Sequence, residues 1–299
     1  MNNSVPFVSI IIPAYRDWIR LSLCLDSLTK QSWPQDQFEV IVVNNKPDDR
    51  APEGFQLAEN TVLIDETKSG SYAARNAALK ISRGSIVGFT DSDCIVDKDW
   101  ISNAVEIFEN HPEIARIGGA INIFFKGNMP TVVELHDKIF AFPQEAYVKS
   151  GNAVTGNMFS RKMVFDRIGL FDDTLLSGGD HQWGMLAQQN GFPIIYGPNV
   201  QVNHPARDSL KELVIKEKRI GLGQANFKDA NRLSSWAAFK QTLDLCKPRR
   251  WEIKIIFNKG KRYGLVSKIA VVAIRHYIKI TGDLTRIHHL TKRTEKVSI

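Results

Sequence analysis

Gly84-Ser-Ile-Val-Gly-Phe-Thr-Asp-Ser-Asp-Cys94 is the stretch of this chain that most strongly constrains its fold. Its Ile, Val, Phe and Thr residues are typical of a buried strand, and the run ends at two carboxylates, Asp91 and Asp93. Alternate side chains of an extended chain point the same way, so both carboxylates can face one ligand beyond the strand. Paired oxygen ligands suit Mg²⁺ or Mn²⁺, and these ions suit a diphosphate.

Strand and helix signals alternate through the first half of the chain. Strands are expected at Val8–Ile12, Phe38–Val43 and Thr61–Ile64, and helices at Ile19–Thr29, Tyr72–Ser82 and Trp100–Asn110. This alternation predicts an α/β fold with a mostly parallel central sheet that is covered by helices on both faces. Ligands of such sheets bind beyond the carboxyl ends of the strands, where Pro13, Ala14, Tyr15, Asn44 and Asn45 are also expected.

The second half of the chain gives a more mixed pattern. The expected strands are Arg116–Ile123, Ala153–Met158, Ile194–Tyr196 and Val200–Val202, and the expected helices are Lys162–Ile168 and His181–Asn190. We expect one large domain at residues 1–235 and a basic, helical C-terminal extension at residues 236–299.

Composition and cysteines indicate a globular protein of a reducing compartment. Hydrophobic residues make up 43% and charged residues 24% of the 299 residues. Cys24, Cys94 and Cys246 have no metal-type spacing and are expected to be buried thiols. The start of the chain lacks a basic segment before its first apolar run, and no window approaches the roughly 18 apolar residues of a spanning helix. We therefore expect a cytoplasmic protein without an integral membrane segment.

Basic residues concentrate near the C-terminus. The net charge is +7, but residues 247–299 hold 14 Lys and Arg against 3 Asp and Glu. This asymmetry favours an anionic partner, phospholipid before nucleic acid. On a helix, Lys268, Arg275, Lys279 and Arg286 fall within about 40° of one another. Such a stripe predicts contact with an anionic membrane surface, at the inner face of the cell membrane, or a helix packed on the rest of the protein. Gly282 is expected to interrupt that helix.

Further short motifs follow in a defined order along the chain. They are Val8-Ser-Ile-Ile-Ile-Pro-Ala-Tyr15, Phe38-Glu-Val-Ile-Val-Val-Asn-Asn45, Gly70-Ser-Tyr-Ala-Ala-Arg-Asn76, Phe89-Thr-Asp-Ser-Asp-Cys94, Thr155-Gly-Asn-Met158, Gly178-Gly-Asp180 and Val202-Asn-His204. Together they resemble the landmarks of the inverting family 2 glycosyltransferases, which have the Rossmann-like GT-A fold. The resemblance covers residues 7 to 225.

This resemblance assigns expected roles at the donor site. Asp93 would be the direct metal ligand, and Asp91 would hold a ribose hydroxyl or a metal-bound water. His204 would contact the metal or the diphosphate, although a histidine in a turn is more often a polar surface or capping residue. Asp180 would be the general base that takes the proton of the acceptor hydroxyl, and its alternative role is that of a helix N-cap.

The nucleotide pocket is less sharply defined by sequence. Pro13, Ala14 and Tyr15 would line it, and Arg75 would contact the nucleotide or else form a salt bridge beneath the sheet edge. The family commonly has an aspartate after the second strand, where this chain has Asn44 and Asn45. An asparagine offers an acceptor and two donors, so Asn45 could still read a uracil edge.

The resulting expectation is an enzyme. It would be a Mn²⁺- or Mg²⁺-dependent, inverting glycosyltransferase that uses a nucleotide-diphospho-sugar, UDP-linked, and a saccharide or lipid-linked saccharide acceptor in cell-surface polysaccharide assembly. One alternative is a nucleotidyltransferase, but the loop from Pro13 to Asp17 lacks the expected glycine. Another is a nucleic-acid-binding protein that uses the basic tail, which its few interleaved aromatic residues disfavour.

Overall fold

The computed structural model describes residues 5–226, 234–245, 247 and 249–292. Cys246 and the last seven residues of the basic tail lie outside these residues. Contacts divide the chain into two units, and each is described by itself. Unit 1 comprises residues 1–122, 142–174 and 179–205, and unit 2 comprises residues 123–141, 175–178 and 206–299.

Unit 1 contains an eight-stranded sheet, in the order β3-β2-β1-β4-β7-β6-β8-β5. Its strands are β1 (Val8–Ala14), β2 (Phe38–Asn44), β3 (Thr61–Asp65), β4 (Ile86–Thr90), β5 (Ile95–Val96), β6 (Arg116–Phe124), β7 (Asn157–Arg161) and β8 (Ile194–Pro205). The predicted α/β class is confirmed. Strands β3, β2, β1 and β4 are parallel, as predicted. Strand β7 runs antiparallel to both β4 and β6, and strand β5 runs antiparallel to β8.

Two strand predictions in the second half were wrong in detail. The strand expected at Ala153–Met158 begins only at Asn157, because Gln144 holds the loop before it. Its amide nitrogen donates to the Val154 and Asn157 carbonyls, and its amide oxygen accepts from the Val154 N–H. The two short strands expected near residue 200 form the single strand β8.

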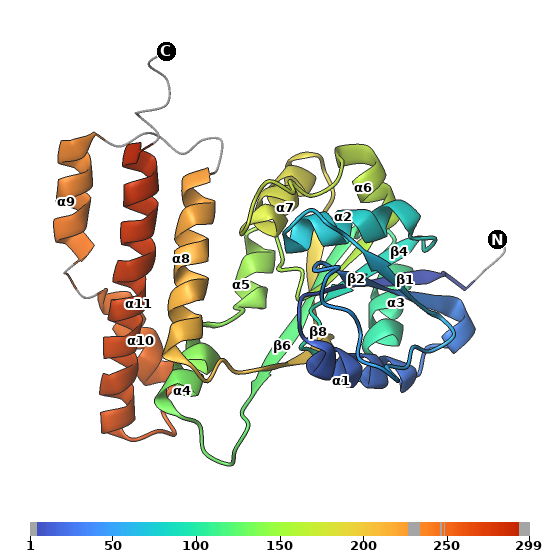
Figure 1. The fold of residues 1–299 in the computed structure, drawn as a ribbon, viewed down its shortest axis with the longest axis horizontal. Coiled ribbons are helices and arrows are strands. Elements are labelled where there is room, and N and C mark those ends of the chain that lie inside the picture. Colours follow the sequence, from blue (N-terminus) through green and yellow to red (C-terminus); the bar gives the residue numbers. More distant parts are fainter. Residues whose placement is uncertain (1–4, 227–233, 246, 248, 293–299) are drawn as a thin grey trace. The chain divides into compact units, whose positions relative to one another are not determined.

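Helices cover both faces of the sheet (Figure 1). Alternate residues of β1 and β2 pack with the buried faces of α1 (Trp18–Thr29) and α3 (Trp100–Asn110) in one core. On the other face, Phe89 of β4 contacts Phe165 of α6 (Lys162–Ile168) and Phe171, which in turn contacts Tyr72 of α2 (Ser71–Ile81). Unit 1 also contains η1 (Gln35–Gln37), α5 (Gln144–Lys149) and α7 (Gly179–Gln189).

The parallel strands bring their carboxyl ends to one edge. Ala14 pairs in register with Asn44, and Asn44 pairs with Asp65. β4 ends at Thr90, directly before Asp91. The predicted convergence of polar residues at this edge therefore follows from the register of the sheet.

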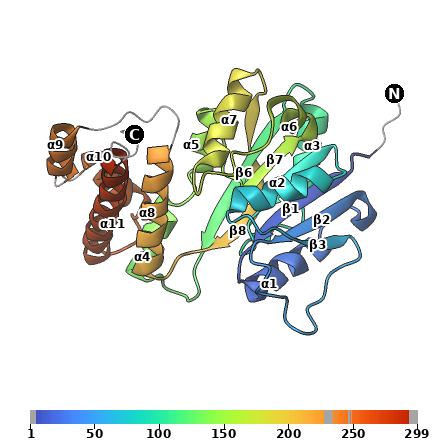
Figure 2. The ribbon, with the colours of Figure 1, turned by 45° about the horizontal axis from the view of Figure 1, so that its top comes forward.

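The elements that lie wholly within unit 2 are helices. They are α4 (Val132–Phe140), α8 (Leu210–Asn226), α9 (Ser235–Leu245), α10 (Arg250–Lys259) and α11 (Leu265–Lys292). Leu135, Ile139, Ile256 and Val271 form a small apolar core. α8 and α11 run side by side (Figures 1 and 2) and approach so closely that a Cβ on Gly221 would collide with the backbone of Gly282. Gly282 therefore permits a helix contact and does not interrupt α11, contrary to expectation.

The basic stripe of α11 lies on one helix face, but it faces other helices. Arg275 is 2.7 Å from the buried Glu252 of α10, and Lys279 is 3.3 Å from the buried Glu217 of α8. Buried carboxylates need paired cations, so these residues are committed inside unit 2. Of the two alternatives for the stripe, these contacts agree with a helix packed on other helices, and contact of the tail with a membrane stays a prediction. In the described part of the chain, no helix is both long and apolar enough to cross a membrane.

Candidate functional site

Asp91 occupies the first position after β4 and is held by an arginine from α2. Arg75 Nη2 donates to Asp91 Oδ1 over 2.6 Å, and the Arg75 side chain is almost fully buried. About a third of the Asp91 side chain remains exposed, at 34%. Of the two roles considered for Arg75, the structure contains the salt bridge beneath the sheet edge. Asp91 is thereby fixed in orientation and keeps an accessible side toward a ligand.

Asp93 and His204 come from distant parts of the chain and meet at this edge. His204, near the end of β8, is buried, and its Nε2 lies 3.6 Å from Asp93 Oδ1. His204 Nδ1 lies 2.7 Å from the carbonyl oxygen of Pro205. A carbonyl only accepts, so Nδ1 carries the proton of that bond. In the neutral ring Nε2 then directs its lone pair at a carboxylate, and a cation between the two atoms would satisfy both.

The donor set fits a divalent metal ion. One ligand atom each from Asp93, Cys94 and His204 lies within 4.8 Å of the other two. Burial, followed by the Asp91 and Asp93 carboxylates, raises the pKa of the Cys94 thiol well above its ordinary value. A protonated thiol is a poor ligand for a hard cation, whereas carboxylate and imidazole both bind Mn²⁺. Asp93 and His204 are the residues that could hold the metal.

Asp180, in the first turn of α7, has partners on both carboxylate oxygens. Oδ1 accepts from the Tyr72 hydroxyl over 3.0 Å and from the His181 N–H over 2.9 Å. Oδ2 accepts only a longer bond from the Thr155 N–H, over 3.3 Å, among the contacts described. Each carboxylate oxygen has two lone pairs, so Oδ2 can still accept a proton. The geometry allows a general base that is held in place by its other oxygen.

Small residues allow Asp180 and Asp91 to lie near the same loop. Thr155 contacts Asp180, and the following Gly156 is so close to Asp91 that an added Cβ would lie 3.2 Å from Asp91 Oδ2. An added Cβ on Gly179 would lie 2.8 Å from the Tyr72 ring. Gly179 therefore permits close packing on the Tyr72 ring, and a side chain at Gly156 would press on the Asp91 carboxylate. This explains two glycines of the motifs found in the sequence.

The residues expected to line a nucleotide pocket lie at the carboxyl ends of β1 and β2, but not all of them have the expected contacts. Ala14 ends β1, and the exposed Tyr15 follows it, 56% accessible. Asn45 Nδ2 donates to the carbonyls of Glu66 and Lys68, and Asn45 Oδ1 accepts from the Gly70 N–H. Its side chain thus anchors the loop before α2. Any contact between Asn45 and a nucleobase would use the remaining lone pair of Oδ1.

Sequence reasoning missed two residues of the site. Arg20 of α1 is half-exposed, and its Nη1 lies 3.6 Å from Asp93 Oδ2. Tyr72 contacts Asp180, as described above. The only sequence signal for Tyr72 was its place in the Gly70–Asn76 motif, and Arg20 had no signal beyond its charge.

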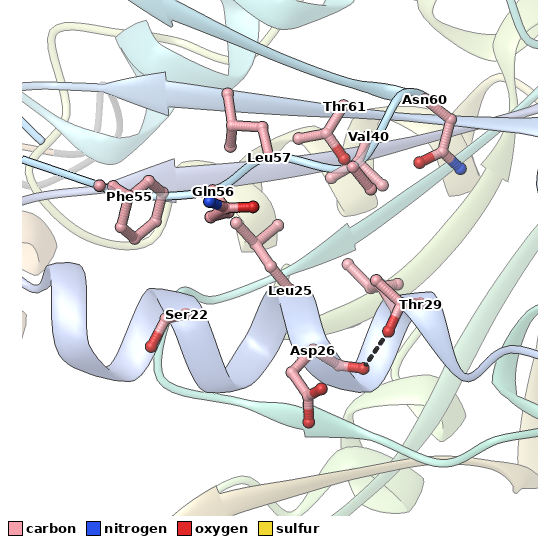
Figure 3. A pocket seen from close by; sticks show the side chains of 13 residues that line it. Ser22, Leu25, Asp26, Thr29, Val40, Phe55, Gln56, Leu57, Asn60 and Thr61 are labelled. Carbon is pink, nitrogen blue, oxygen red and sulfur yellow. Dashed lines mark hydrogen bonds between the residues drawn. The ribbon is translucent and has the colours of Figure 1, made fainter.

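A pocket of about 500 Å³ lies elsewhere in unit 1. Figure 3 shows its lining by Leu25 and Ser22 of α1, by Val40 of β2 and by the segment from Phe55 to Thr61. Val40 and Thr61 belong to the starts of their strands, whereas the carboxylate site lies at the strand ends. None of the predicted site residues lines this pocket. It is therefore separate from the proposed chemistry.

The sequence also matches known proteins. Residues 9–169 match the pattern of the family described as Glycosyl transferase family 2. A protein of Haloferax volcanii named glycosyltransferase AglE is 32% identical across 99% of this chain and all of its own length. A Methanococcus voltae protein is 24% identical over 70% of each chain, and its name is dolichyl N-acetyl-alpha-D-glucosaminyl phosphate 3-beta-D-2,3-diacetamido-2,3-dideoxy-beta-D-glucuronosyltransferase.

A solved structure supports the fold. The mannosyltransferase PcManGT of Pyrobaculum calidifontis, determined in complex with GDP-Man and Mn²⁺, aligns with a TM-score of 0.59 at 16% identity. The alignment covers 98% of this chain and 89% of the mannosyltransferase. The expected GT-A fold is thereby confirmed.

Proposed function

Because this chain belongs to glycosyl transferase family 2 and is a sugar-transferring enzyme, we propose that it is metal-dependent and inverting. Its donor is a nucleotide-diphospho-sugar, UDP-linked, and its acceptor is a hydroxyl of a saccharide or lipid-linked saccharide. Family membership decides against the nucleotidyltransferase alternative. The proposed setting is cell-surface polysaccharide assembly in the cytoplasm, at the inner face of the membrane.

One observation carries the metal proposal: the 3.6 Å approach of His204 Nε2 and Asp93 Oδ1. Asp93 and His204 would hold Mn²⁺ or Mg²⁺, and the bound ion would stabilise the negative charge of the leaving diphosphate. The mannosyltransferase of like fold was solved with Mn²⁺, which agrees with this proposal. Arg75 fixes Asp91 beside that site, where Asp91 can accept a hydrogen bond from a ribose hydroxyl or a metal-bound water.

Asp180 supplies the acid–base chemistry in this proposal. Its Oδ2 takes the proton of the acceptor hydroxyl while that oxygen attacks the anomeric carbon. Tyr72 and the His181 N–H hold Oδ1, so the carboxylate cannot rotate freely. A single displacement with one base inverts the anomeric carbon, whereas a retaining double displacement needs a second, nucleophilic carboxylate. Asp91, the other carboxylate beside the Thr155–Gly156 loop, is engaged by Arg75.

The donor nucleotide would lie along the carboxyl edge of β1 and β2. Pro13, Ala14 and Tyr15 line this edge, and Asn45 shapes the loop that follows it. The name of the Methanococcus voltae relative describes transfer to a sugar on a dolichyl phosphate. This similarity supports a lipid-linked saccharide as the acceptor class.

The decisive experiment is a thermal-stability panel of nucleotide sugars, with UDP- and GDP-linked donors, each measured with and without Mn²⁺. A donor at one hundred times its Kd stabilises the folded state by about 2.7 kcal/mol. We expect one UDP-sugar to give an upward shift of Tm that requires Mn²⁺. Asp93→Ala should abolish the shift. Asp180→Asn should keep the shift and lose sugar transfer.

Other outcomes would contradict the proposal. A shift of equal size without any metal would remove the metal dependence. A shift with GDP-sugars alone would overturn the choice of UDP. Transfer at the normal rate by Asp180→Asn would show that another group is the base.

A further inference from the structure

The turn between α10 and α11 exposes large apolar side chains. Phe257 at the end of α10 and Leu265, Val266 and Ile269 at the start of α11 are all exposed, Val266 to 82%. These residues fall within residues 257–269, which we call the hairpin tip. Single exposed apolar residues are ordinary, but four within thirteen positions form a patch that favours a partner.

Cations surround this patch. Lys254, Lys261 and Arg262 are exposed, and Lys268 lies 5.5 Å from the centre of the Phe257 ring. No acidic residue occurs between Glu252 and Asp283. Among the described residues, Lys261 and Arg262 have no carboxylate within ion-pair distance, in contrast to Arg275 and Lys279. The charges at the hairpin tip are therefore available to a partner.

The exposed apolar surface continues along α11. Val266, Ile269, Ala273, Tyr277 and Leu284 are exposed, and their spacing places them within about 80° on a helix. This face differs from the stripe that pairs with Glu217 and Glu252. α11 thus directs its basic stripe into unit 2 and leaves an apolar stripe outside.

We propose that the hairpin tip and the apolar stripe of α11 dock on an anionic phospholipid surface. The apolar side chains enter the boundary between headgroups and acyl chains, and Lys254, Lys261 and Arg262 contact headgroup phosphates. We choose an anionic lipid surface because its charge is complementary to the cations of the hairpin tip. A second copy of the chain would bring the same cations against one another, with no acidic residue at the tip to offset them. The inference does not depend on the metal or the donor.

The test is flotation of the full chain with vesicles of phosphatidylcholine, with or without phosphatidylglycerol. We expect binding only to the phosphatidylglycerol vesicles, weakened by salt. Lys261→Ala with Arg262→Ala should weaken binding about thirtyfold, because each cation near an anionic surface contributes separately. Val266→Asp with Ile269→Asp should weaken it at least as much. Both variants change exposed side chains, so an unchanged Tm would show that they fold.

A matched control is available on α1. Ile19 is 80% exposed, as Val266 is, but it belongs to unit 1, so Ile19→Asp should bind vesicles like the unmodified chain. The proposal is overturned if the unmodified chain does not float with anionic vesicles, or if both tip variants float as well as it does. It is also overturned if, without lipid, Val266→Asp with Ile269→Asp converts a dimer into a monomer, because the apolar stripe would then bind a second copy.

Discussion

The Tyr72 hydroxyl donates a hydrogen bond over 3.0 Å to Oδ1 of Asp180, a residue 108 positions later in the chain. Burial, and then the charge of Asp180, raises the pKa of Tyr72. The hydroxyl therefore keeps its proton and acts only as a donor to this carboxylate. Tyr72 is in this account a positioning residue for the base.

Tyr72→Phe should lower kcat about tenfold, because a hydrogen bond to a charged group is lost while the ring still packs on Gly179. The donor KM should stay unchanged. Steady-state kinetics of transfer measure both effects. A donor KM that rises as kcat falls would mean that Tyr72 supports the fold of the site and does not position the base.

Arg20→Ala should raise the donor KM about tenfold. The half-exposed guanidinium lies beside Asp93, within reach of a diphosphate held by the same metal, and its loss removes a charge-assisted contact. Lys30→Ala is the matched control, because Lys30 is an exposed cation at the C-cap of the same helix and its partner is Asp26. Steady-state kinetics of both variants provide the measurement. An unchanged donor KM in Arg20→Ala would exclude Arg20 from the donor site.

His136 of α4 predicts a pH dependence of stability. It is buried, and neither ring nitrogen has a hydrogen-bond partner in the described part of the structure. Burial, and then the charge of Arg275, lowers its pKa to about 3. Below about pH 6.5 the unfolded chain takes up a proton that the folded chain refuses. Stability is therefore complete above that pH and falls by up to about 1.4 kcal/mol per pH unit below it.

His136→Phe should flatten this dependence between pH 6.5 and 4, because phenylalanine has no proton to take up and can pack on Phe140, whose ring centre is 5.1 Å away. Chemical unfolding at several pH values measures the free energy of unfolding and therefore its slope with pH. Equal slopes for the unmodified chain and His136→Phe would refute the assignment.

Local sequence patterns predicted most of unit 1. The buried parallel strands and their helices have clear periodicity, and the strand ends located Asp91 and Asp93. The motifs suggested Asp180 and His204, but no local pattern could predict that Asp93 Oδ1 and His204 Nε2 approach to 3.6 Å. That distance depends on how β5 and β8 pair. The contacts of Tyr72 and Arg20 depend in the same way on packing between distant segments.

The basic tail shows a different limit. Helical spacing correctly placed Lys268, Arg275 and Lys279 on one face of α11. It could not reveal that Glu217, from another helix, becomes buried and pairs with two of them. Helical spacing also places Val266 and Ile269 together, on the apolar face of α11. Which face of a helix meets solvent is decided by its neighbours.

Electron paramagnetic resonance of bound Mn²⁺, recorded with UDP, tests the metal site most directly. The account predicts one histidine nitrogen coupled to Mn²⁺ in the unmodified chain. The coupling should disappear in His204→Gln, and tight binding itself should disappear in Asp93→Asn. Mn²⁺ that binds equally tightly in both variants, or that shows no nitrogen coupling in the unmodified chain, would contradict a cation held between Asp93 and His204.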